Sequence, residues 1–249
     1  MRRLLSFCSF AAACALGCGQ APATGPDGGF LSFGDAASDA ASSSDAVSGE
    51  VDGGFPLPDG GVIAADRFVT GVVSFTPGDC AGFGATALPG IVEGPPVGAG
   101  SSAGSTDVVS LGVGGSIVLS FAPNAIVDGP GVDFVVFENA FYVNGDPMHP
   151  FADPGEVSVS DDGETWTAFP CDPKDLEHTQ CAGWHPVMSS PENGISPFDV
   201  EHAGGDDFDL ASIGVAHARY VKIRDVGTTM AAPNAGFDLD AIAVVNAGD

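Results

Sequence analysis

The chain has 249 residues, and 7 Lys+Arg stand against 33 Asp+Glu, which gives a formal net charge of −26. This acidic excess argues against nucleic acid or an anionic membrane face as a direct partner, because both would repel the protein. It also supplies oxygen ligands for a hard cation such as calcium. The 36 glycines and 19 prolines indicate turns and loops rather than long helices.

Residues 1–17 have the pattern of an export signal. Two arginines precede an apolar run, residues 4–16, that is too short to span a bilayer. The run ends in Ala-Leu-Gly-Cys at residues 15–18, which resembles the lipobox of bacterial lipoproteins, although Ala15 stands where that motif usually has Leu. The resemblance implies lipidation of Cys18 and anchoring at the cell envelope, in the outer membrane or at the cell surface. A second, poorer candidate is Ala-Ala-Ala-Cys at residues 11–14.

Residues 18–61 consist mainly of Ala, Ser, Gly, Pro and Asp, with acids but no base. Their scattered apolar residues could not form a core, so this segment predicts a disordered linker. Charge repulsion and proline should extend the linker and hold the next domain away from the membrane.

Residues 62–249 are enough for one domain. Its apolar runs are short, rich in β-branched residues and bounded by Gly, Pro, Asn or Asp, which is typical of strands. Residues 133–137 and 241–245 are apolar on both faces and should lie between layers. Only residues 206–214 suggest a short helical turn, with Asp206 or Asp207 as its cap. Many strands without interleaved helices predict an all-β fold, an antiparallel sandwich of jelly-roll type.

One hairpin is marked clearly in residues 156–173. Asp162-Gly163 separates two strand segments, and glycine accepts the positive φ of a tight turn. We expect Trp166, just after this turn, to enter the core or cap it.

The hairpin, Val-Ser-x-Asp-Gly-x-x-Trp, and residues 218–225, ARYVKIRD, resemble motifs of the discoidin-like, galactose-binding-type jelly rolls. A closer resemblance is to a family of bacterial cell-surface lipoproteins of delta-proteobacterial type. It rests on GVDFVVFENAF, CAGWHPV, GGDDFDLA, ARYVKIRD and GFDLDAIAVV, in this order between residues 111 and 245. The resemblance implies the architecture and the cell-envelope location, and it implies no particular chemistry.

Cys171 and Cys181 bracket a short polar loop. Pairing is the default for cysteines of exported proteins, so we expect a disulfide between these two. The partnership of Cys80 stays open.

Acid clusters give the main chemical hint. Carboxylates buried together are costly unless a cation neutralises them, so a structural calcium site is one expectation. The alternative is that these acids cap turns, accept backbone hydrogen bonds or face water. The candidate metal ligands are Glu138, Asn139, Asp206, Asp207, Asp209, Asp238 and Asp240.

Aromatic side chains near loops can stack on sugar faces. The candidate ligand-binding residues are Tyr142, Trp184 and His185. We therefore expect non-catalytic binding of a carbohydrate or an extracellular protein, with no nucleic acid partner. The alternatives are a structural or assembly component of the envelope and, less favoured, a glycan-active hydrolase using a carboxylate pair.

Overall fold

The computed structural model describes residues 54–56, 60–174, 180–227 and 235–249, and all of them belong to the unit Asp45–Asp249. The predicted signal peptide over residues 1–17, the predicted lipidation site Cys18 and most of the predicted linker lie outside these residues. Within the described ranges, no helix has the length and apolar character that a membrane span requires.

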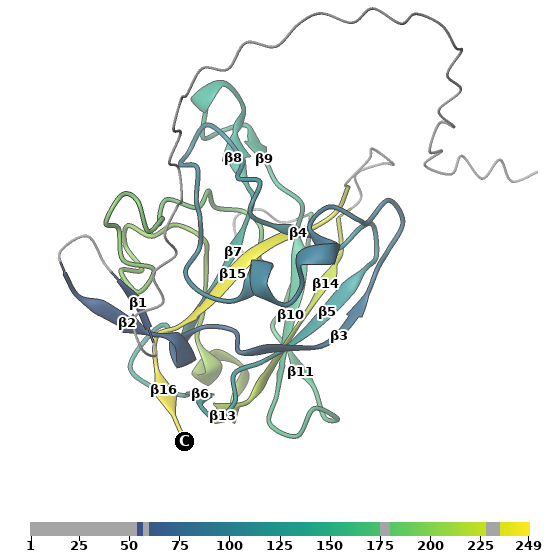
Figure 1. The fold of residues 1–249 in the computed structure, drawn as a ribbon. Coiled ribbons are helices and arrows are strands. Elements are labelled where there is room, and N and C mark those ends of the chain that lie inside the picture. The colour runs from purple at the N-terminus through teal and green to yellow at the C-terminus, as the bar shows by residue number, and fades with distance from the viewer. Residues whose placement is uncertain (1–53, 57–59, 175–179, 228–234) are drawn as a thin grey trace, which may run out of the picture. The chain divides into compact units, whose positions relative to one another are not determined.

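The predicted all-β antiparallel sandwich is confirmed, and its larger sheet has five strands (Figure 1). Neighbouring strands of this sheet all pair antiparallel. In spatial order they are β11 (Thr167–Ala168), β10 (Gly155–Ser160), β14 (Tyr220–Asp225), β5 (Ser116–Ser120) and β3 (Gly71–Thr76).

The facing sheet has four strands, also antiparallel. Their order is β12 (Asp206–Phe208), β7 (Phe134–Glu138), β15 (Asp238–Val244) and β4 (Val109–Ser110). The register between β7 and β15 shifts between Leu239 and Ala241, so Asp240 occupies a bulge.

Three smaller sheets and five short 3-10 turns complete the described part of the fold. The small sheets pair β13 (His217–Ala218) and β16 (Ala247–Gly248) with β6 (Ala125–Val127), β8 (Phe141–Tyr142) with β9 (Pro150–Phe151), and β1 (Gly54–Pro56) with β2 (Val62–Ala64). The turns are η1 (Ala65–Arg67), η2 (Ala85–Ala87), η3 (Gly90–Val92), η4 (Val143–Gly145) and η5 (Leu210–Ile213).

The main core lies between the two larger sheets. Alternate residues point into it, as the two-residue period of a strand requires. Three rings join the layers: Phe134 of β7 stacks on Phe208 of β12 with centroids 5.1 Å apart, and Phe169, which follows β11, meets Phe208 edge-on at 4.8 Å. All three rings are buried.

A second core covers the other face of the four-stranded sheet. Val135 and Phe137 of β7 point into it, opposite to the main-core residues of the same strand. The prediction that this strand lies between layers is therefore confirmed. The covering rings include Phe55 of β1, whose centroid is 5.5 Å from that of Phe68. Strand β1 lies inside the segment predicted as a linker over residues 18–61. This part of the segment is ordered because Phe55 packs against the second core.

The hairpin predicted in residues 156–173 is present, with β10 paired to β11. Asp162 accepts hydrogen bonds from the N–H groups of Glu164 and Thr165, and Gly163 adopts φ 74°. These hydrogen bonds hold the pKa of Asp162 well below its usual range. Trp166 is half-buried, with Lys222 Nζ 4.3 Å from its ring centroid, and Phe169 takes the core position instead.

The predicted disulfide between Cys171 and Cys181 is present, with a sequence separation of 10. Closing a loop of this size contributes about 2–3 kcal/mol in the chain-entropy account. Ala182, next to Cys181, exchanges two backbone hydrogen bonds with Gly155 of β10, each of 2.9 Å. The segment that leads to Trp184 is thus fixed to the sandwich.

The helical turn predicted over residues 206–214 is shorter and begins later. Asp206 and Asp207 belong to strand β12, because Phe208 pairs with Phe134 and fills the main core. The turn itself is η5, and its cap is Asp209, whose Oδ1 accepts a hydrogen bond from Ala211 N at 2.8 Å.

Candidate functional site

The structure separates the candidate residues into different neighbourhoods. Some meet at the end of the four-stranded sheet below the β8–β9 hairpin, and others lie in a cleft, beside η5 or at the hairpin itself. The first group is Glu138, Asn139 and Asp238; the cleft holds His185, Asp206 and Asp207; Asp209 lies beside η5, Asp240 at the bulge, and Tyr142 and Trp184 at the hairpin.

Glu138, which is buried, and Asp238, which is half-buried, form a carboxylate pair where β7 ends and β15 begins. Glu138 is only 3% exposed, and its Oε1 accepts a hydrogen bond from the backbone N–H of Asp238 at 3.2 Å. The other oxygen of Glu138, Oε2, is buried without a hydrogen-bond partner, and so is Oδ1 of Asp238. Such orphaned oxygens are costly, because burial has removed their water.

Two further polar residues frame this pair. Asn139 accepts a hydrogen bond from Ser105 N through Oδ1, and its side chain also hydrogen-bonds the carboxyl of Asp238. Asn139 therefore positions Asp238, and its own oxygen is occupied. Asp153, which follows β9 and is 8% exposed, repels both Glu138 and Asp238.

The pKa values of the pair reflect this crowding. Burial raises the pKa of Glu138 well above its usual value, and repulsion by Asp238 adds to the rise. Burial likewise raises the pKa of Asp238 to about 6, against the lowering effect of its hydrogen bond to Ser110.

The chain supplies no basic side chain to offset these acids within its described residues. Arg219 pairs with Asp161, and Arg224 pairs with Glu156 on the five-stranded sheet. Arg67 donates hydrogen bonds to backbone carbonyls of Val244 and Val245, Lys222 covers Trp166, and Lys174 is exposed beside the disulfide.

Asp240 has its own surroundings at the bulge. Both its oxygens lie 3.1 Å from the backbone N of Val97, which donates to them. Burial raises the pKa of Asp240 to about 8, and repulsion by Asp107 adds to this rise. The raised pKa favours the protonated form of Asp240, and its carboxyl anchors the loop of Val97.

Asp206 belongs to the wall of a cleft of about 390 Å³. Its Oδ2 accepts hydrogen bonds from Gly183 N and Trp184 N, and its Oδ1 lies 2.7 Å from His185 Nδ1. This contact to Asp206 raises the pKa of His185. Burial raises the pKa of the neighbouring Asp207. Asp206 is fully engaged, so it acts as the organiser of the loop that carries Trp184.

Asp209 lies with Asp128 and Asp133 in a triad of carboxylates whose ligand oxygens are all within 4.8 Å of one another. Hydrogen bonds already occupy two of its three carboxylates. Asp133 accepts from Gly129 N, Leu210 N and Asn246 Nδ2, while Asp209 caps η5. The triad is explained as a structural junction.

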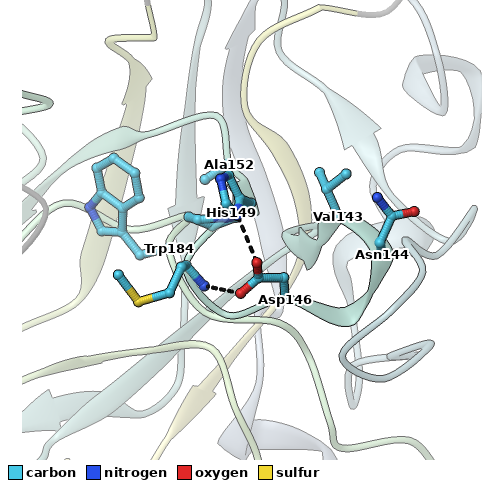
Figure 2. A pocket seen from close by; sticks show the side chains of 8 residues that line it. Val143, Asn144, Asp146, His149, Ala152 and Trp184 are labelled. Atoms are coloured by element: carbon cyan, nitrogen blue, oxygen red, sulfur yellow. Dashed lines mark hydrogen bonds and ion pairs between the residues drawn. The ribbon is translucent and has the colours of Figure 1, made fainter.

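Trp184 borders a hollow of about 670 Å³ beside the β8–β9 hairpin. Figure 2 shows its indole at one end and Asn144 at the other, with His149 and Asp146 between them. Asp146 accepts a hydrogen bond from Met148 N at 3.0 Å, and its Oδ2 lies 2.8 Å from His149 Nδ1. Exposed apolar surface of Met148 adjoins these polar groups. The indole Nε1 is buried and unpartnered among the described residues.

Comparison with protein-family models and with curated proteins gives no match. The geometry of these neighbourhoods is therefore the basis for assigning a role to the chain.

Sequence reasoning brought together some of these residues and missed others. Tyr142 donates its backbone N–H to Ser101 O, but its half-buried side chain does not line the hollow. Asp146 and His149 were not predicted as a pair, although their spacing of three within a loop was the available signal. Asp153 had no such signal, because the path of its loop depends on the approach of Gly183 to its backbone.

Proposed function

We propose that this chain is a lipid-anchored envelope protein whose β-sandwich binds a neutral carbohydrate, without catalysis, in the Trp184 hollow. The observation that carries the proposal is the hollow itself. One aromatic side chain and three polar side chains, those of Asn144, Asp146 and His149, converge on one space. Its volume of about 670 Å³ falls in the range of small-molecule sites.

The chemistry of the lining suits a sugar. An indole packs on the apolar C–H face of a pyranose ring, while an amide, a carboxylate and an imidazole can hydrogen-bond its hydroxyl groups. The backbone N–H of Trp184 donates a hydrogen bond to Asp206, and the disulfide lies nearby. Both hold the segment of Trp184 in place before binding, which limits the entropy lost on binding. The net charge of −26 favours a neutral ligand over an acidic one.

Trp184→Ala should weaken binding of a neutral oligosaccharide by roughly 10–30-fold, the loss typical of a tryptophan hot spot. A glycan array with the full chain would identify the oligosaccharide, and titration calorimetry would measure its affinity. Trp166→Ala is the matched control, because Trp166 lies away from the hollow, under Lys222.

Three results would contradict this proposal: no neutral glycan bound by the full chain, unchanged affinity in Trp184→Ala, or an equal loss in Trp166→Ala. Release of reducing ends from a bound glycan would contradict the non-catalytic part.

The anchor rests on the lipobox-like residues 15–18. Cys18→Ala should abolish partitioning into the detergent phase, because the acyl chains that hold the protein at a membrane would be missing. Phase separation in a cloud-point detergent, together with labelling by radioactive palmitate, measures this. A Cys18→Ala protein that still carries label would refute the lipidation site, and Cys14→Ala tests the other cysteine.

A further inference from the structure

The carboxylate pair Glu138–Asp238 is the place where the described structure leaves charge uncompensated. Glu138 Oε2 and Asp238 Oδ1 are buried and have no hydrogen-bond partner. Asp153 adds a third carboxylate that repels both. The basic side chains of the described residues lie elsewhere, as set out above. Buried anions without a partner are costly, so such a pair is neutralised either by protons or by a bound cation.

A divalent cation suits the pair best. Its two charges cancel those of Glu138 and Asp238, and it accepts the lone pairs of the two orphaned oxygens at once. We propose that Glu138 and Asp238 bind one calcium ion at the base of the β8–β9 hairpin. The inference does not depend on carbohydrate binding.

The donor set points to calcium among the common metals. The ionisable side chains that act on the pair within the described residues are carboxylates, with no histidine or cysteine among them. Oxygen donors favour calcium or magnesium over zinc and copper. The two carboxylates come from separate strands, the end of β7 and the start of β15. Calcium tolerates such irregular geometry, whereas magnesium demands a near-ideal octahedron.

The test uses the full chain at pH 7.5, stripped with EDTA and then titrated with CaCl₂. Calorimetry should show one site per chain. At 100 times the dissociation constant, calcium should raise the melting temperature by roughly 5–10 °C. The same concentration of MgCl₂ should raise it by less than half as much. No calcium heat and no thermal shift would overturn the site, and an equal shift with magnesium would overturn the choice of calcium.

Glu138→Gln distinguishes a bound ion from a pair that is merely protonated. The glutamine oxygen can still accept the hydrogen bond from Asp238 N, so the variant should fold, but the calcium shift should disappear. Asp238→Asn should act in the same way. Asp207→Asn is the matched control, because Asp207 lies in the His185 cleft, and it should keep the full shift. Calcium shifts that survive in both Glu138→Gln and Asp238→Asn would refute the proposal.

Discussion

Phe134→Ala is expected to lower the free energy of unfolding by about 3–5 kcal/mol, the cost of removing a fully buried ring from a packed core. Phe134 is 0% exposed and contacts both Phe208 of its own sheet and Phe169 of the facing sheet. The surrounding sheets limit collapse around the cavity. Urea denaturation followed by fluorescence gives the change in midpoint and in slope.

Phe83→Ala is the control for this experiment. Phe83 is 38% exposed, so its truncation should cost less than about 1 kcal/mol. A Phe134 variant as stable as the Phe83 variant would show that the two sheets do not share the core described above.

Asp133→Ala should also destabilise the protein by about 3–5 kcal/mol, because it leaves several buried donors without an acceptor. Asp133 is 0% exposed, and its side chain accepts hydrogen bonds from Gly129 N, Leu210 N and Asn246 Nδ2. It thus joins the start of β7 to η5 and to the end of β15. The free energy of unfolding from urea titration measures the loss.

Asp128→Ala is the matched comparison, since Asp128 belongs to the same triad but is exposed. Its removal should change stability by no more than about 0.5 kcal/mol. Two results together would mean that the triad is a metal site and not a structural junction. These are similar losses of stability in the two variants, and stabilisation by added calcium of the wild type but of neither variant.

The strands could be predicted because their signals are local. The runs around Val135 and Ile242 are apolar at every position, and only a strand covered on both faces can bury such a run. Asp162-Gly163 marks its turn through the φ that glycine permits. Cys171 and Cys181 were paired from their spacing and compartment alone.

The arrangement of the acids could not be predicted in the same way. Glu138 and Asp238 are 100 residues apart, and their meeting depends on the register of β7 with β15. Asp206 looked like a metal ligand in the sequence, but three partners from residues 183–185 occupy its carboxylate. Trp166 was expected to enter the core or cap it; it is half-buried, and Phe169 fills the core position instead.

The lengths of the outermost strands affect whether crowded copies of this domain associate through their sheet edges. Edge strands offer unpaired backbone groups to neighbouring molecules and promote polymerisation when they are long and flat. Here β11 and β4 have two residues each and β12 has three, while the longer β3 is interrupted by a bulge near Val73. Copies of this domain crowded side by side therefore have little open backbone for edge-to-edge strand pairing.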